Sequence, residues 1–125
     1  MDYHVVLSPS ARADLRDIVR YISLDAPDRA LEFGQFLISH TKGLALFPEL
    51  GRVVPELGNH FIREIIVRSY RIIYRINNSE NLIEVVRFWH ALAAFLKSTL
   101  ERQFSIRQSL SSILKHESFA QIVTP

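Results

Sequence analysis

The sequence contains no cysteine, one methionine, one tryptophan, and few residues that interrupt regular structure: four glycines and five prolines among 125 residues. Without cysteine, a disulfide framework and a thiolate metal site are excluded. No apolar run approaches the roughly 20 residues of a membrane-spanning helix. The start, MDYHVVLSPS, lacks the basic and apolar regions of a signal peptide. We therefore expect a cytoplasmic protein without membrane contact.

The chain does contain enough apolar residues for one folded domain, and its charge is unevenly distributed. Hydrophobic residues make up 48% of the sequence, which predicts a packed core. Residues 1–50 hold five basic and seven acidic residues, whereas residues 51–125 hold ten and six. Twelve of the fifteen basic residues are arginine, whose planar fork suits phosphate and carboxylate. The second half is where we expect an acidic partner, and a solvated arginine-rich surface is the alternative.

The first fifty residues predict a strand followed by two helices. Tyr3–Leu7 is a short β-rich run. Ser8 is suited to cap a helix that begins with Pro9, and apolar residues at i, i+4, i+7 and i+11 form its stripe. The segment DAPD ends this helix. A second, antiparallel helix is expected from about Asp28 to about Phe47. Its buried face is expected to comprise Phe33, Leu37, His40, Leu44 and Phe47.

Three strands and a C-terminal helix are predicted in the second half. The loop FPELGRVVPELGNH precedes strands at about Phe61–Val67, Tyr70–Ile76 and Leu82–Trp89. Leucines at four-residue steps then predict a helix from Ala91 to about Glu117. The order β-α-α-β-β-β indicates an α+β fold: an N-terminal strand and an antiparallel helical hairpin packed on a mostly antiparallel sheet, plus the C-terminal helix. Residues 1–90 form the main domain, and residues 91–125 are a helical extension of it.

Four arginines interrupt the apolar segment REIIVRSYRIIYRI, which begins at Arg63. Because strand side chains alternate, Arg71 and Arg75 share one face, and the register decides which other arginines join them. Such a cluster would clamp phosphate. The alternative is cross-strand ion pairing with Glu64 and Glu84, worth about 0.2–1 kcal/mol per pair. The arginines expected to bind phosphate or an acidic partner are Arg63, Arg68, Arg75 and Arg87.

His90 ends the last predicted strand and is the best-placed general acid or base, since its ordinary pKa lies near 6.5. Strict alternation puts it with Phe88, on the face opposite to Arg87 and Trp89. Glu56, in the preceding loop, is a second acid–base candidate. The alternative for both is a purely structural role. The other histidines lack metal-ligand spacing, and phosphate-loop and nucleophile-elbow motifs are absent. We expect neither a metal site nor a cofactor.

Four segments carry a family resemblance: SPSARADLRDIVRYI, LFPELGRVVPEL, IREIIVRSYRIIYRI and LIEVVRFWH. In this order they resemble the RelE/ParE superfamily of bacterial type II toxins, and within it the ParE-like plasmid stabilisation branch. The resemblance covers about residues 3–90. It implies that ParE-like members bind and poison DNA gyrase, whereas RelE-like members are metal-independent, ribosome-dependent mRNA endonucleases. Toxins of both kinds are neutralised by a cognate antitoxin that wraps around them.

For the nuclease branch, the resemblance implies Glu56 as the base, Arg71 as the phosphate stabiliser and His90 as the acid. Family members often have an arginine three residues after this histidine, where this chain has Ala93. We expect a ParE-like toxin that inhibits growth by binding gyrase. The alternatives are an mRNA endonuclease that uses the trio and acts on ribosome-bound mRNA, and an inactive relic or interaction domain. The C-terminal helix is the expected contact if the chain forms a homodimer.

Overall fold

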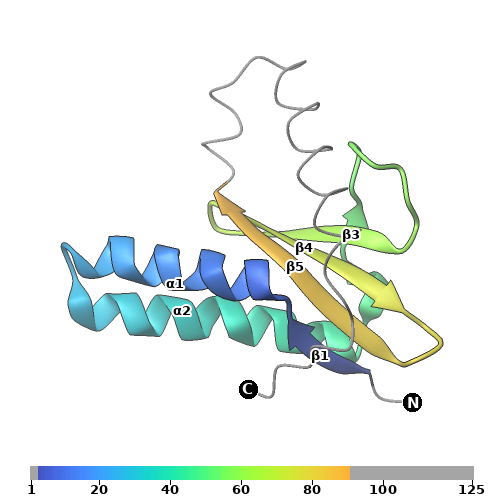
Figure 1. The fold of residues 1–125 in the computed structure, drawn as a ribbon, viewed down its shortest axis with the longest axis horizontal. Helices are drawn as coiled ribbons and strands as arrows, with labels where there is room; N and C mark the ends of the chain where they lie inside the picture. The colour runs from blue at the N-terminus through green and yellow to red at the C-terminus, as the bar shows by residue number, and fades with distance from the viewer. Residues whose placement is uncertain (1–2, 91–125) are drawn as a thin grey trace.

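The computed structural model describes residues 3–90 of the chain, and Figure 1 shows how they fold. In chain order they form β1 (His4–Leu7), α1 (Pro9–Ser23), α2 (Pro27–Lys42), the 3₁₀ turns η1 (Gly43–Ala45) and η2 (Pro48–Leu50), β2 (Arg52–Val53), β3 (Ile62–Val67), β4 (Tyr70–Asn77) and β5 (Leu82–His90). The predicted α+β fold is confirmed for these residues. The expected C-terminal helix and the extension at residues 91–125 lie outside them.

The five strands form one sheet in the order β1-β5-β4-β3-β2. Strand β1 runs parallel to β5, and the other neighbouring strands are antiparallel. The hairpin of α1 and α2 lies against one face of the sheet (Figure 1). We call this the helix face, and the opposite side the far face.

The first helix begins as the sequence predicts, and its cap also attaches it to the sheet. The Ser8 hydroxyl accepts a hydrogen bond from the Ala11 amide at 3.0 Å, which satisfies one of the free amides of the first turn. The same hydroxyl donates to the Val86 carbonyl at 3.1 Å. Ser8 is completely buried, so one side chain fixes both the start of α1 and its position on β5.

The second helix ends earlier than predicted. Helix α2 stops at Lys42, and the chain tightens into η1 instead of continuing to Phe47. Leu44 stays buried, but Phe47 is 65% exposed, so its expected place on the buried face is wrong. The two-residue strand β2 was not predicted either, because the loop around it is rich in proline and glycine.

Apolar side chains pack on both faces of the sheet. On the helix face, side chains from both helices meet alternate residues of β3, β4 and β5. The largest members of this core are Leu37, Leu44, Ile72, Tyr74, Ile76, Ile83 and Phe88. A smaller cluster on the far face comprises Val54, Ile62, Ile73 and Val86, with Leu57 and Trp89 against it. No helix within residues 3–90 combines the length and apolarity needed to cross a bilayer.

Strand β5 contains a bulge that changes which side chains share a face. The register jumps between Ile73 and Tyr74 of β4, so Val86 has no partner in that strand. Phe88 consequently joins the helix-face core, and Trp89 packs against the far-face cluster. Phe88 and Trp89 lie on opposite faces, as the sequence predicts for the end of this strand, but the extra residue puts Phe88 on the same face as Ile83 and Val85, which strict alternation along the whole strand does not allow.

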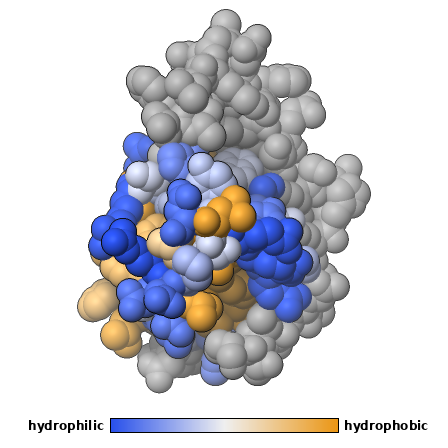
Figure 2. Space-filling view, turned by 90° about the vertical axis from the view of Figure 1, so that its left-hand side faces the viewer, coloured by the Kyte–Doolittle hydropathy of each residue, from blue (hydrophilic) through white to orange (hydrophobic). Residues whose placement is uncertain are grey.

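The tip of the helical hairpin, at the left of Figure 1, faces the viewer in Figure 2. Hydrophilic residues dominate this surface, and apolar side chains emerge between them. Tyr21, Leu24 and Leu31 are 76%, 78% and 66% exposed. These leucines provide surface positions remote from the far face.

Candidate functional site

Arg71, the second residue of β4, binds two carboxylates on the far face. Its Nε donates to Oε1 of Glu64 at 2.7 Å, and its two terminal nitrogens donate to the two oxygens of Glu56 at 3.1 and 3.2 Å. Arg71 is 8% exposed and Glu64 is 1% exposed. Burial opposes the guanidinium charge, but the hydrogen bonds and negative charges of Glu56 and Glu64 outweigh it, so the pKa of Arg71 is raised.

Glu64 also binds a second arginine. The Nε of Arg52, in β2, donates to Oε2 of Glu64 at 2.6 Å, and the Arg52 side chain is 66% exposed. The four residues Arg52, Glu64, Arg71 and Glu56 thus form a continuous line from the solvent into the sheet, which we call the charge chain. Its two positive and two negative charges cancel, which is the condition for keeping such groups buried.

The strand register and one turn bring the charge chain together. Arg71 lies opposite Ile66 of β3, so Glu64, two residues earlier on the same face, is its diagonal neighbour. Glu56 comes from the loop between β2 and β3. The amides of Leu57 and Gly58 both donate to the Val54 carbonyl, which folds this loop into a tight turn. Gly58 has a φ of +62°, a conformation that glycine adopts without strain.

Two of the arginines expected to bind an acidic partner form ion pairs within the chain. Arg75 binds Glu84, directly opposite in β5, at 2.8 Å. Arg87 binds both oxygens of Asp14 in α1, at 2.6 and 2.8 Å. Asp14 also accepts a hydrogen bond from the Phe88 amide at 3.0 Å. Phe88 lies in the part of β5 that continues past the end of β1. For Arg75, this is the cross-strand pairing considered from the sequence.

The other two expected arginines contact loops and an aromatic ring. Arg63 donates to the Gly51 carbonyl at 2.9 Å and to the His60 carbonyl at 3.1 Å. Arg68 has a positive φ in the β3–β4 turn, and its guanidinium lies 4.6 Å from the ring centre of Phe36. Arg68 is exposed, whereas the side chain of Arg63 is 11% exposed.

The structure brings Glu56 to Arg71 but places His90 on the other face of the sheet. His90 lies opposite Tyr70 in the register, and their rings meet edge to face with centres 4.9 Å apart. Tyr70 packs against the helix-face core. The residue of β5 opposite Arg71 is Trp89, whose indole cannot transfer a proton as an imidazole does. The bulge in β5 produces this division of the three residues.

A comparison with known families agrees with the fold. The family model described as ParE toxin of type II toxin–antitoxin system, parDE, matches residues 5–95. This chain belongs to the ParE toxin family. A search of curated protein sequences finds no significant match.

Two solved structures have the fold of this ParE family member. One is the chromosomal ParDE TA system from P. aeruginosa, with a TM-score of 0.60, 19% identity, and coverage of 70% of this chain and 95% of that one. The other is the RelBE2 toxin–antitoxin complex from Mycobacterium tuberculosis, with a TM-score of 0.54, 19% identity, and coverage of 72% and 99%. At this identity the likeness establishes the shared fold.

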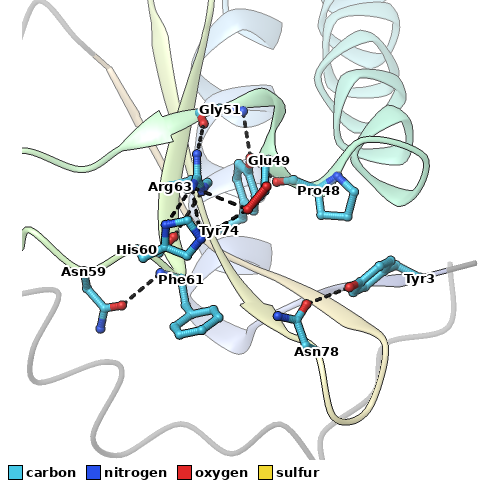
Figure 3. Close-up of polar contacts among 10 residues, drawn as sticks. All are labelled: Tyr3, Pro48, Glu49, Gly51, Asn59, His60, Phe61, Arg63, Tyr74 and Asn78. Carbon is cyan, nitrogen blue, oxygen red and sulfur yellow. Dashed lines mark hydrogen bonds and ion pairs between the residues drawn. The ribbon is translucent and has the colours of Figure 1, made fainter.

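The ParE domain also has a hollow of about 600 Å³ near the ends of β3 and β4. Phe47 and Phe61 are among the apolar residues that line it. At its rim, the His60 ring contacts Glu49 at 3.1 Å, and Arg63 reaches the same carboxylate at 3.8 Å (Figure 3). The hollow therefore combines exposed apolar walls with a polar edge.

Gly51 connects this rim to the charge chain. Its amide donates to the Tyr74 hydroxyl at 2.9 Å, and that hydroxyl donates to the Pro48 carbonyl at 2.6 Å (Figure 3). A Cβ atom at position 51 would lie 2.5 Å from the Glu64 carbonyl oxygen, so this close approach requires glycine. Burial raises the pKa of Tyr74 above its usual value.

Sequence reasoning missed Arg52, Asp14 and the position of Trp89. A signal for Asp14 existed, because it lies three residues after Ala11 and four before Ile18, on the buried stripe of α1, where an unpaired carboxylate is costly. Arg52 and Trp89 depend on register and on the bulge, for which the sequence offers no clear signal. Within residues 3–90, no group of three His, Asp or Glu side chains has the proximity needed to hold a metal ion.

Proposed function

We propose that this protein is the toxin of a type II toxin–antitoxin pair and that it inhibits growth in the cytoplasm by binding DNA gyrase, without catalysis of its own. Membership of the ParE family supports the first part. The absence of catalysis is supported by the division of Glu56, Arg71 and His90 between the two faces of the sheet.

The position of His90 is the observation that carries this proposal. General acid–base catalysis of RNA cleavage requires the acid, the base and the phosphate-binding group around one phosphodiester. Glu56 and Arg71 meet on the far face, whereas His90 contacts Tyr70 on the helix face. Moreover, both oxygens of Glu56 already accept hydrogen bonds from Arg71.

The proposed partner besides gyrase is a cognate antitoxin. The two solved structures described above are toxin–antitoxin systems. The hollow beside Phe47 and Phe61 and the exposed Ile66 of β3 offer apolar surface for an antitoxin segment.

The second candidate function is ribosome-dependent mRNA cleavage without a metal. The direct contact between Glu56 and Arg71 favours it, because it places a base beside a phosphate-binding group. In this case a rearrangement at the end of β5 would have to bring His90 to the far face. An inactive relic or interaction domain is the third candidate.

Induced expression with pulse labelling of DNA and protein synthesis distinguishes the three candidates. We expect DNA synthesis to stop first, and the purified protein to inhibit supercoiling by gyrase. The His90→Ala variant should remain as toxic as the wild type. An early stop in translation with new mRNA ends, abolished by His90→Ala in a folded protein, would replace the gyrase proposal with the nuclease. Unchanged growth would leave the third candidate.

A further inference from the structure

The arginines of the sheet and those of the first helix differ in what they contact. Every arginine in strands β2 to β5 lies within ion-pair distance of a carboxylate of the same chain. Helix α1 carries three further arginines, Arg12, Arg16 and Arg20, and all three are exposed. Within residues 3–90, no hydrogen bond or ion pair engages their side chains. These guanidinium groups are therefore available to an acidic partner, whereas those of the strands are already bound.

The three arginines follow one another along the side of α1 that borders α2. They are spaced four residues apart, which places them at intervals of about 6 Å along the helix axis. A Cβ atom added at Gly34 of α2 would lie 2.9 Å from a methyl group of Val19, so these two residues mark where the helices meet. Arg16 and Arg12 precede Val19 by three and seven residues and therefore share its side of α1.

Helix α2 contributes apolar side chains and a fourth positive charge to the same surface. Leu31 and Ile38 lie three residues before and four residues after Gly34, and Leu31 is 66% exposed. Because the helices run antiparallel, the exposed Lys42 at the end of α2 lies level with Arg12 (Figure 1). We call this surface, directed away from the sheet, the outer hairpin surface; it comprises Arg12, Arg16, Arg20, Leu31, Ile38 and Lys42.

An acidic amphipathic helix is complementary to the outer hairpin surface. Carboxylates at four-residue spacing on such a helix repeat with the same rise as the arginines, and its apolar side chains would cover Leu31. A nucleic acid fits less well, because its affinity depends on many phosphate contacts and the three arginines span only about 12 Å. The exposed acids Asp17, Asp28 and Glu32, in the half of the hairpin nearer its tip, would also repel a longer chain of phosphates.

We propose that the outer hairpin surface binds an acidic amphipathic helix of a partner protein. The carboxylates of that helix pair with Arg12, Arg16 and Arg20, and its apolar side chains pack against Leu31 and Ile38. This surface lies on the helical hairpin, whereas the charge chain lies on the far face of the sheet, so the two sites are separate. The proposal does not depend on whether the growth target is gyrase or the ribosome.

Two synthetic helical peptides provide the test with the full chain. The first is labelled with fluorescein and carries three glutamates four residues apart, with leucines on the adjacent side. The second has glutamine at the three glutamate positions. We expect fluorescence anisotropy to show binding of the acidic peptide, and the glutamine peptide to bind at least about tenfold more weakly at low salt, because three exposed ion pairs are lost.

The Arg16→Glu and Arg29→Glu variants form a matched pair. Both arginines are exposed on the hairpin, but Arg29 lies on the flank of α2 away from α1. We expect Arg16→Glu to weaken binding of the acidic peptide at least about fivefold and Arg29→Glu to change it less than about twofold. A peptide with lysine at the central glutamate position should bind Arg16→Glu more tightly than it binds the wild type. Far-UV circular dichroism checks that both variants fold.

Three results would contradict the proposal. They are no binding of the acidic peptide, equal binding of the acidic and glutamine peptides, and equal weakening by Arg16→Glu and Arg29→Glu. A short single-stranded oligonucleotide that binds more tightly than the acidic peptide, and is released by Arg16→Glu, would instead assign these arginines to a nucleic acid. None of these assays measures toxicity, so their outcome is independent of the pulse-labelling result.

Discussion

Replacing Arg71 by alanine should destabilise the protein far more than replacing Arg52, although both arginines bind the carboxylate of Glu64. The Arg71 side chain is 9% exposed and that of Glu64 is fully buried. Removing one partner of a buried ion pair costs about 3–5 kcal/mol. Because Arg52 continues to bind Glu64, we expect the lower end, about 3 kcal/mol. For a domain of this size, that loss lowers Tm by roughly 10–25 °C.

The Arg52→Ala variant is the matched control for this experiment. The Arg52 side chain is 66% exposed, so solvent screens its interaction with Glu64. We expect a loss below about 1 kcal/mol. Urea unfolding followed by far-UV circular dichroism measures both free energies by linear extrapolation. The combined variant Glu64→Leu with Arg71→Met should be more stable than Arg71→Ala, because it removes the fully buried carboxylate of Glu64 together with Arg71, while Glu56 loses the same contact in both variants.

Equal losses for Arg71→Ala and Arg52→Ala would refute this reasoning, because they would show that the two arginines share the carboxylate equally. A loss below about 1 kcal/mol for Arg71→Ala would refute it as well, since a buried charge cannot be exposed so cheaply unless water already reaches it.

Three other predictions follow from contacts of single residues. Gly51→Ala should destabilise the protein by about 1–3 kcal/mol, because the new Cβ would lie 2.5 Å from a backbone atom. Gly43→Ala should stabilise it by about 0.4–1 kcal/mol, because the new Cβ would have no atom within 4 Å. Urea unfolding compares the two variants. The raised pKa of Tyr74 means that folding favours its neutral form. The stability gained in this way is present below about pH 10 and is lost as pH rises through the folded-state pKa. Tyr74→Phe should therefore flatten the alkaline part of a plot of stability against pH. Asp14→Ala should cost about 1–3 kcal/mol by calorimetry, because the partly buried Arg87 guanidinium and the Phe88 amide lose their acceptor; an unchanged Tm would contradict this role.

Local signals predicted much of the fold. Ser8 and Pro9 mark the start of α1, and the observed cap confirms them. The alternation in β3 and β4 correctly separated the helix face from the far face, since Ile72 and Ile73 pack in different clusters. These features succeed because each depends on residues close in the sequence. The predicted end of α2 was wrong because the apolar helical stripe continues through Leu44, although the backbone changes to a 3₁₀ turn at Gly43.

The candidate site was harder to predict because it depends on distant pairings. Cross-strand ion pairing was considered for the arginines, and it occurs between Arg75 and Glu84. The contact between Glu56 and Arg71 joins a loop to the central strand, so no local pattern encodes it. The sequence could not place His90 relative to Arg71, because that relation is set by the bulge in β5, which depends on how the strand packs and carries no signature of its own.

The bulge also leaves β5 with one residue, Val86, that is not paired with β4. If Val86 entered the ladder and the end of the strand slid by one position, Trp89 and His90 would exchange faces. Phe88 would then leave the core, at a cost of about 1.5–3 kcal/mol, and this cost keeps the strand in its observed register. Two relatives of equal length could therefore present the same histidine on opposite sides of the sheet without any substitution at position 90. In this family, the role of a residue in β5 can be inferred from a relative only after the register of this strand has been compared in the two structures.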